Sequence, residues 1–408
     1  MIYTIEKVTT LIGAHRYGDK AAKVAFLLTD SRSLCFPEET LFFALKSERN
    51  DGHHYIPELY RRGVRNFVVS QVPHEYSSLY PEANFLKVVQ PLEALQRLAE
   101  RHRDEFNIPV VGITGSNGKT MVKEWLSQLL SPDSFVTRSP RSYNSQIGVP
   151  LSVWLLNEQT RVGVFEAGIS KPGEMQALRD IIQPTIAVLT SLGKAHQENF
   201  ESMEAKCREK LILFHDAATL VYNADDPVVA HVMSTANFPG ERLYWSQTDS
   251  KAPFFIESVE KQDCITTVHY RYREQAGSYK LPFIDAASVS NSFACATVAL
   301  ALGLTADKLA QRMQQLEPVA MRMEVKEGQH GCTLINDSYN SDINSLDIAL
   351  DFMNRRPDHK ERRHTLILSD IFQSGERPDE LYREVSDLAT KRGVDKFIGI
   401  GPELCRQA

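Results

Sequence analysis

One short segment constrains the fold of this chain more than any other: TGSNGKT, residues 114–120. An apolar run at 109–114 before it predicts a buried strand, and MVKEWLSQLL after it predicts a helix. Glycines in such a turn let backbone N–H groups approach phosphate oxygens, and the helix N-terminus adds its positive dipole end. We therefore predict a nucleotide-phosphate site made by Thr114, Gly115, Ser116, Asn117, Gly118, Lys119 and Thr120.

Two side chains of this segment suit that chemistry. Lys119 can neutralise the β- and γ-phosphates, and the Thr120 hydroxyl can bind Mg²⁺. The generic spacing G-x-x-x-x-G-K-[ST] fails, because Ile113 stands where its first glycine belongs. A purely structural glycine-rich turn is the alternative, and the preceding strand, the following helix and the Lys-Thr pair argue against it.

The rest of the chain alternates apolar runs with helical patterns. Strands are expected at 162–165, 185–190 and 218–223, which favours a doubly wound parallel sheet in an α/β fold. A charged helix at 95–104 closes the preceding region, and after a break near Glu317 further strands are expected at 333–336, 365–370 and 396–401. We predict three domains, at residues 1–105, 106–318 and 319–408.

Composition excludes several classes of protein. The 408 residues carry a net charge of -6, which does not suit a nucleic-acid binder. Six scattered cysteines without a CxxC pair favour a reduced, cytoplasmic protein with neither disulfides nor a zinc ribbon. The N-terminus lacks the pattern of a signal peptide. The longest apolar stretch, near 293–304, is too short to span a bilayer and predicts a buried helix.

Polar residues follow the predicted strands at the edge where parallel sheets bind ligands. Glu166 ends one strand, His196 follows the next, and Asn223 follows the third. Alone, Glu166 would be a solvated loop carboxylate and His196 a surface or capping histidine. A phosphate loop at the same edge makes both candidate ligands of Mg²⁺, which prefers oxygen donors.

These segments resemble the Mur ligase family, in TGSNGKT, Glu-Ala-Gly at 166–168, Ala-His-x-x-x-Phe at 195–200 and Lys210-x-x-Leu-Phe. The resemblance implies catalytic roles for Lys119, Glu166, His196 and Lys210. It implies ATP and two Mg²⁺ ions, with Thr120, Glu166, His196 and a Lys210 carbamylated by CO₂ as metal ligands. By itself Lys210 would be a solvent-facing lysine, and Lys206 competes for its role without the downstream spacing.

Further nucleotide contacts are implied by the same resemblance. Asn223 and Asn291 match adenine-side segments, although Ala287 and Ser288 replace a preceding His-Asn pair. A helix N-cap is the alternative reading of Asn291. Arg322 and Asp337 match residues that reach the nucleotide once the domains close.

Other segments indicate a branch of the family. Residues 29–56 resemble a uridine-binding domain, with Ser31, Arg32 and Asp51 in its motifs. Residues 142–152 and 336–345 resemble the branch that adds D-alanyl-D-alanine to UDP-N-acetylmuramoyl-tripeptide, and they contain the candidate substrate-binding residues Asn144, Ser145, Tyr339 and Asn340. The implied activity is ATP-dependent carbon–nitrogen ligation through an acyl phosphate, in the peptidoglycan synthesis that supports cell wall, cell shape and cell division.

Departures from the family pattern occur at Ser47, Asp342-Ile343, Ser369 and Gln373. Relatives also continue beyond the position where this sequence stops, and some carry a fused alanine racemase domain. We therefore expect an incomplete third domain and weak ligase activity.

Three alternatives stay open. A folylpolyglutamate-synthase-like ligase would have its phosphate loop near the N-terminus, without a uridine-binding module before it. A non-catalytic nucleotide-binding module would have no reason to keep the full set of phosphate and metal residues. A motor ATPase or GTPase would need an aspartate where Glu166 stands.

Overall fold

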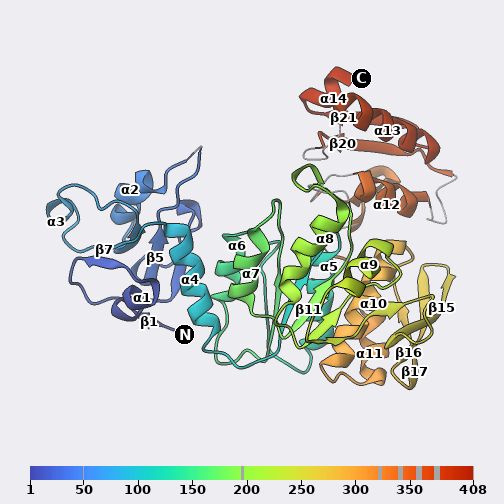
Figure 1. Cartoon of the computed structure of the whole chain (residues 1–408). Coiled ribbons are helices and arrows are strands. Elements are labelled where there is room, and N and C mark those ends of the chain that lie inside the picture. Colours follow the sequence, from blue (N-terminus) through green and yellow to red (C-terminus); the bar gives the residue numbers. More distant parts are fainter. Residues whose placement is uncertain are drawn as a thin grey trace.

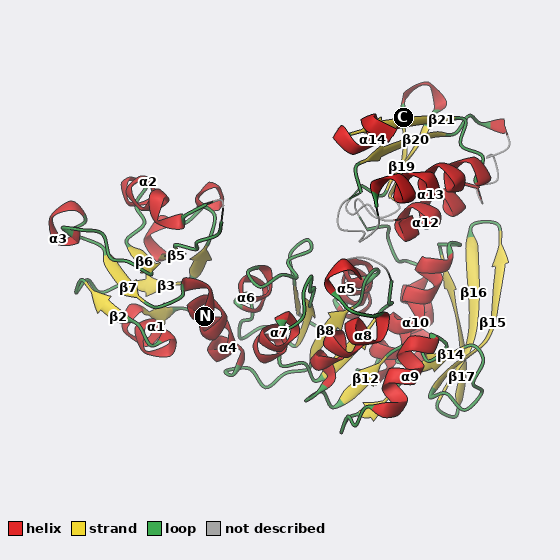
Figure 2. Ribbon diagram, turned by 45° about the horizontal axis from the view of Figure 1, so that its top comes forward, coloured by secondary structure: helices red, strands yellow, loops and turns green. Residues whose placement is uncertain are grey.

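The computed structural model describes residues 1–48, 50–193, 197–319, 324–338, 343–354, 361–371 and 377–407. Three α/β units follow one another, from the blue N-terminal unit at one end to the red C-terminal unit at the other (Figure 1). Helices lie on both sides of the central strands (Figure 2). Within the described residues, no helix is long and apolar enough to cross a membrane.

The N-terminal unit is built on a five-stranded sheet of order β2-β7-β6-β5-β4. Its β2 strand pairs antiparallel with β7, and the other neighbours are parallel. Strands β5 and β6 are buried along their whole length, as expected for parallel strands covered on both faces. The elements are β1 (Tyr3–Thr4), α1 (Ile5–Ile12), β2 (His15–Tyr17), β3 (Lys23–Val24), β4 (Phe26–Leu28), β5 (Thr40–Phe43), α2 (Ile56–Arg61), β6 (Asn66–Val69), α3 (Tyr76–Leu79), β7 (Asn84–Lys87) and α4 (Pro91–Arg103).

The central unit confirms the predicted parallel sheet. Six parallel strands run in the order β13-β12-β11-β8-β10-β9, with the phosphate-loop strand β8 between β11 and β10. Its elements are β8 (Val110–Thr114), α5 (Lys119–Leu130), β9 (Val136–Arg138), α6 (Gly148–Val153), β10 (Val162–Glu166), α7 (Glu174–Ile182), β11 (Ile186–Leu189), α8 (Met203–Leu211), β12 (Thr219–Val221), α9 (Pro227–Thr235), β13 (Glu241–Arg242), α10 (Ala286–Ala301) and α11 (Ala306–Met313).

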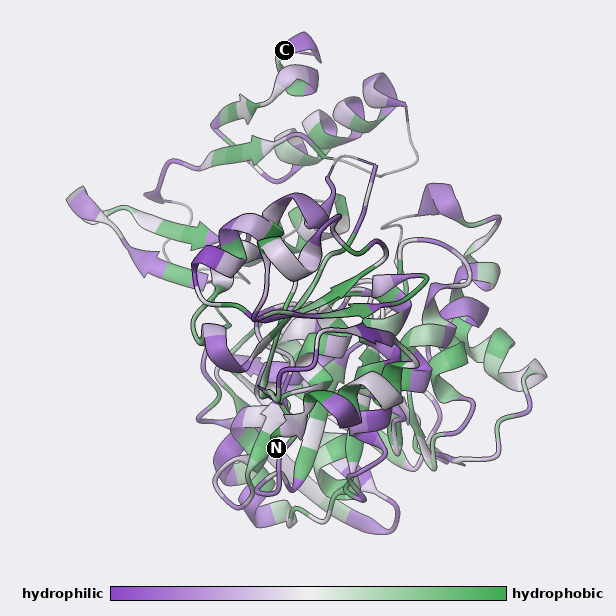
Figure 3. Ribbon diagram, turned by 90° about the vertical axis from the view of Figure 1, so that its left-hand side faces the viewer, coloured by the Kyte–Doolittle hydropathy of each residue, from purple (hydrophilic) through white to green (hydrophobic). Residues whose placement is uncertain are grey.

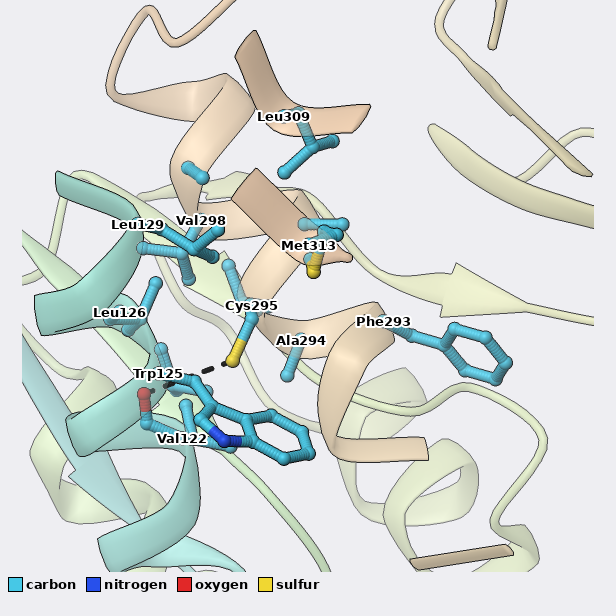
Figure 4. Close-up of a cluster of buried hydrophobic side chains, with 14 of the residues drawn as sticks. Val122, Trp125, Leu126, Leu129, Phe293, Ala294, Cys295, Val298, Leu309 and Met313 are labelled. Atoms are coloured by element: carbon cyan, nitrogen blue, oxygen red, sulfur yellow. Dashed lines mark hydrogen bonds between the residues drawn. The ribbon is translucent and has the colours of Figure 1, made fainter. Parts of the chain in front are cut away.

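Apolar side chains cover both faces of this sheet. Helices α5 and α10 cover one face, where Trp125 and Leu126 of α5 lie against Cys295 and Val298 of α10 (Figure 4). Helices α6, α7 and α8 cover the other. Hydrophobic residues accordingly concentrate along the central strands (Figure 3). The apolar stretch near 293–304 is largely the buried helix α10, as predicted.

We did not predict a second sheet in the central unit. Strands β14 (Trp245–Ser246), β15 (Phe254–Gln262), β16 (Ile265–Tyr272) and β17 (Gln275–Leu281) form it in chain order. Its two hairpins are antiparallel. It packs on α11 through β17 and shares one core with α10.

The third unit contains the three strands expected from the sequence. Its elements are β18 (Glu324–Glu327), β19 (Thr333–Asn336), α12 (Ile343–Asn354), β20 (Thr365–Ser369), α13 (Pro378–Lys391), β21 (Lys396–Ile400) and α14 (Pro402–Gln407). Strands β20 and β21 pair in parallel, as βαβ connections require. The domain boundaries at residues 105 and 318 stay predictions.

Candidate active site

The phosphate loop joins the end of β8 to the start of α5. Gly115 has φ +145° and Gly118 has φ +86°. A Cβ atom at Gly115 would lie 2.0 Å from Thr190 Oγ1, and one at Gly118 would lie 2.4 Å from Asn291 Oδ1. Both positions therefore need glycine for its backbone freedom and for its lack of a side chain.

Residues that follow β11 hold the loop in shape. The Ser116 N–H donates to Ser191 O at 2.8 Å, and Asn117 N–H donates to Ser191 Oγ at 3.2 Å. Thr190 Oγ1 donates back to Asn117 O at 2.6 Å. Residues 190 and 191, just after β11, therefore hold the backbone of the phosphate loop in place.

Lys119 lies over the loop rather than in solvent. Its Nζ donates to Gly115 O at 2.7 Å and to Ser116 O at 3.1 Å. The ammonium is therefore held at the position where loop backbone and helix N-terminus meet, which is where a phosphate would bind.

Glu166 is the fully buried last residue of β10. Its Oε2 accepts from Thr120 Oγ1 at 3.2 Å and from Asn144 Nδ2 at 3.3 Å. The Lys123 ammonium lies 3.1 Å from Oε1, at an angle that makes an ion pair rather than a hydrogen bond. Three residues predicted from separate motifs, Thr120, Asn144 and Glu166, thus meet at one point.

Lys210 is buried, so the alternative interpretation as a solvent-facing lysine is wrong. Only 3% of it is exposed, and its Nζ donates to Gly115 O at 3.2 Å. Burial, together with the neighbouring charges of Lys119 and Lys206, lowers the pKa of Lys210 well below its ordinary value. Such an environment favours the neutral amine. Lys206, one helical turn earlier, is also buried and donates to Gly193 O at 2.6 Å.

The two asparagines predicted near the base have different surroundings. Asn223 follows β12, and its Oδ1 accepts from Asp225 N at 2.9 Å, which closes a local turn. Asn291 lies inside α10, where its Nδ2 is 3.2 Å from Met121 Sδ and its Oδ1 faces Gly118. The N-cap of α10 is Asp285, which accepts from Ser288 N at 2.7 Å. The capping alternative for Asn291 is therefore wrong.

Several predicted residues lie elsewhere. His196, Arg322, Tyr339 and Asn340 fall outside the described residues. Asp337 directly follows β19 in the third unit. Ser145 precedes α6, and its Oγ accepts from Gly148 N at 3.2 Å.

The N-terminal unit has a cavity of about 730 Å³. Ser31 and Arg32 line it, as does Gly52 next to Asp51. Asp51 itself accepts from His53 N at 3.0 Å and pairs with His53 Nδ1 at 2.6 Å, so it shapes this wall. The lining residues that we did not predict as site residues are Thr29, Asp30, Leu45, Lys46, Ser47, Asn50, Tyr55, Ser70, Val89, Gln90, Pro91, Leu92 and Ile147.

One of these, Ile147, belongs to the segment that also carries Asn144. The cavity wall is therefore continuous in sequence with the residue that contacts Glu166. Elsewhere in the cavity lining, Arg32 pairs with Asp30 at 2.6 Å and lowers the pKa of that carboxyl to about 2.

The fold and this site define a nucleotide-binding α/β protein with a buried carboxylate and buried lysines around its phosphate loop. Residues 113–299 match the family model described as the Mur ligase middle domain. The central unit therefore contains a Mur ligase middle domain.

Similarity to known proteins extends along most of the chain. The chain is 26% identical over 378 residues to the UDP-N-acetylmuramoyl-tripeptide–D-alanyl-D-alanine ligase of Bacillus subtilis, covering 91% of this chain and 79% of that protein. Among solved structures, MurF from Acinetobacter baumannii superposes with a TM-score of 0.85 at 22% identity, over 100% of this chain and 87% of that one. MurF from Thermotoga maritima in complex with ADP gives 0.77 at 23% identity, over 93% and 88%.

Proposed function

We propose that this chain is an ATP-dependent ligase that adds D-alanyl-D-alanine to UDP-N-acetylmuramoyl-tripeptide in peptidoglycan synthesis. The observation that carries the proposal is the buried Glu166 carboxylate, which contacts Thr120 of the phosphate loop and Asn144 of the predicted acceptor segment. The site thus joins the side that binds ATP to the side that binds a second substrate.

The chemistry needs such a junction. A carboxylate of the acceptor attacks the γ-phosphorus of ATP, ADP leaves, and an acyl phosphate forms. The neutral amine of D-alanyl-D-alanine then attacks the acyl carbon, and the C–O bond to phosphate breaks. Two anions must approach in the first step, so the protein contributes mainly positioning and positive charge. Lys119 and the backbone N–H groups of the loop supply that charge.

The predicted Mg²⁺ ions fit the residues present in part. Thr120 Oγ1 and Glu166 Oε2, 3.2 Å apart, are oxygen donors of the type Mg²⁺ prefers. Among the described residues no group of three or more His, Cys, Asp or Glu side chains could hold a metal. Bound Mg²⁺ would neutralise charge on the transferring phosphoryl group. We assign Thr120 and Glu166 as its ligands, and His196 is a further predicted one.

Carbamylation of Lys210 is part of the same proposal. The reaction joins a neutral amine to CO₂, forms a carbamate and releases a proton. The lowered pKa of Lys210 supports it, because burial beside Lys119 and Lys206 favours the neutral form. A carbamate there would add the anionic oxygen ligand that a second ion needs.

The remaining predicted residues are assigned to the nucleotide and to the other substrates. We assign Asn223, Asn291, Arg322 and Asp337 to the nucleotide, and Ser31, Arg32 and Asp51 to the uridine part of the acceptor. Ser145, Tyr339 and Asn340 are assigned to the substrates as well. A cytoplasmic location and a fused racemase domain stay predictions.

A folylpolyglutamate-type ligase is the second candidate, and the N-terminal unit argues against it. A complete five-stranded sheet with its own cavity precedes the phosphate loop. Its cavity offers room for a ligand, and the resemblance of residues 29–56 points to a UDP-sugar.

Phosphate release with a panel of amines tests the proposal. UDP-N-acetylmuramoyl-tripeptide and ATP would be supplied with D-alanyl-D-alanine, D-alanine, diaminopimelate, lysine or glutamate. We expect turnover with the dipeptide alone. Turnover with a single amino acid would assign the chain to another branch, and ATP binding without turnover would favour a non-catalytic module.

A further inference from the structure

Lys123 is a buried lysine to which neither the sequence motifs nor the proposed function assigns a role. It lies one turn into α5 and is fully buried. Four oxygen atoms surround its ammonium: Ser139 O at 2.9 Å, Glu124 Oε1 at 3.0 Å, Glu166 Oε1 at 3.1 Å, and Arg141 O. A buried charge is stable only when it is paired, so these partners indicate what Lys123 holds in place.

Two of the partners belong to the segment 139–145 between β9 and α6, which we call the acceptor loop. Arg141 in this loop has φ +50°, a left-handed conformation that is uncommon for residues other than glycine. Its side chain is exposed and has no hydrogen-bond or ion-pair partner among the described residues. Two contacts hold this turn: Lys123 Nζ donates to Arg141 O, and the Tyr143 N–H donates to Pro140 O at 3.1 Å.

The opposite side of the acceptor loop contacts the nucleotide site. Ser142 Oγ lies 3.0 Å from Thr120 Oγ1, and Asn144 Nδ2 donates to Glu166 Oε2 at 3.3 Å. The Glu166 N–H donates to Ser139 Oγ at 3.2 Å. Lys123 thus holds one oxygen of Glu166 and the loop backbone, while Asn144 contacts the other oxygen.

We propose that Lys123 is a positioning residue that couples the acceptor loop to the Glu166 carboxylate, so that Asn144 is placed for the acceptor. This inference rests on the proposed function for the identity of the acceptor. The competing explanation is a lysine that only stabilises the fold.

Lys123→Met tests this with two measurements on the full chain. Hydrogen exchange of a peptide covering 139–145 needs no ligand, and we expect its protection to be lost while α5 stays protected. Calorimetry without Mg²⁺ should show acceptor affinity reduced about tenfold or more, with ADP affinity within about twofold, as expected when only one coupled partner is lost. Equal losses for both ligands, or unchanged exchange, would contradict the inference.

A second variant controls for the destabilisation that the buried Glu166 Oε1 would cause in Lys123→Met once its ion pair with Lys123 is lost, whereas Glu124 keeps its pair with Arg138. Arg141→Gly favours the left-handed turn without help from Lys123. By itself it should leave acceptor affinity near the wild-type value, and combined with Lys123→Met it should restore a large part of the loss. A double variant no better than Lys123→Met would overturn the inference.

These outcomes separate the inference from the proposed function. Wild-type protein that fails to bind UDP-N-acetylmuramoyl-tripeptide would contradict the proposed function. Unchanged exchange of the acceptor loop in Lys123→Met would contradict the role of Lys123, whatever the wild type binds.

Discussion

Single residues at the site could be predicted where the backbone decides their position. Glu166 ends an apolar strand and Thr120 lies in the first turn of a helix, so both reach the same sheet edge. Lys123, Lys206 and Lys210 could not be recognised as buried from their local pattern. A lysine in a helix is ordinarily exposed, and only the loops packed over α5 and α8 bury these three.

Two glycines with nearly the same φ allow the effect of backbone strain to be measured apart from the effect of a Cβ collision. Gly118 and Gly303 have φ +86° and +88°, but a Cβ at Gly303 would meet nothing within 4 Å. We expect Gly303→Ala to lose about 1–2 kcal/mol of stability and no nucleotide affinity. Gly118→Ala should lose ADP affinity as well, because its Cβ would collide with Asn291. Urea unfolding and ADP titration of both variants check this, and equal ADP affinities would refute it.

Lys210 should make stability depend on pH. Its pKa is lowered in the folded state, whereas an unfolded lysine titrates near about 10.4. Between those two values the unfolded chain binds more protons, so stability rises with pH. Lys210→Met should abolish turnover, gain stability at neutral pH, and show a smaller rise of stability as the pH approaches about 10.4 from below in urea unfolding. A variant with the same slope as the wild type would show that the buried amine is not the cause.

At the scale of elements, the hydrophobic pattern of the sequence was sufficient to predict the parallel sheet but not the second sheet of the central unit. Strands β8, β10, β11 and β12 are continuous apolar runs because helices cover both of their faces. Strands β15 to β17 are only partly buried and carry many polar residues. They form a sheet because β17 packs on α11, a contact distant in sequence.

Helix α10 allows a prediction at this scale. Its N-cap is Asp285, whereas the residue that we assign to the nucleotide is Asn291. Asp285→Ala removes the bond to Ser288 N and should lower the free energy of unfolding by about 1 kcal/mol. ADP affinity should be unchanged. Asn291→Ala should weaken ADP binding instead, so thermal unfolding and ADP titration of the two variants should give opposite results. Loss of ADP affinity in Asp285→Ala would argue against separate roles.

At the scale of the whole molecule, α4 packs against both the N-terminal unit and the central unit. Its His102 accepts from or donates to Tyr3 OH at 2.9 Å and lies 3.0 Å from Leu156 O. Trp154 Nε1 donates across the same interface to Ala25 O at 2.8 Å. The sequence predicts α4 as the end of a domain, but its role as an interface depends on aromatic packing with Trp154, which no local pattern reveals.

This interface should weaken in acid. Burial lowers the pKa of His102 from 6.5 to about 4, so the unfolded chain binds more protons between these values. Stability should therefore fall as the pH drops from 6.5 towards 4, by at most about 3 kcal/mol. His102→Asn should fall less steeply in urea titrations over that range. If the free energy of unfolding fell equally with pH in variant and wild type, His102 would not be the cause of the loss of stability in acid.

The most direct test of the central claim follows one oxygen atom. UDP-N-acetylmuramoyl-tripeptide would carry a heavy oxygen isotope in its terminal carboxylate, and phosphate released with ATP and D-alanyl-D-alanine would be analysed by mass spectrometry. An acyl phosphate leaves one carboxylate oxygen on phosphorus, so we predict a single heavy oxygen in each phosphate formed. Unlabelled phosphate would mean that water attacks ATP, and it would contradict ligation through Glu166, Lys119 and the phosphate loop.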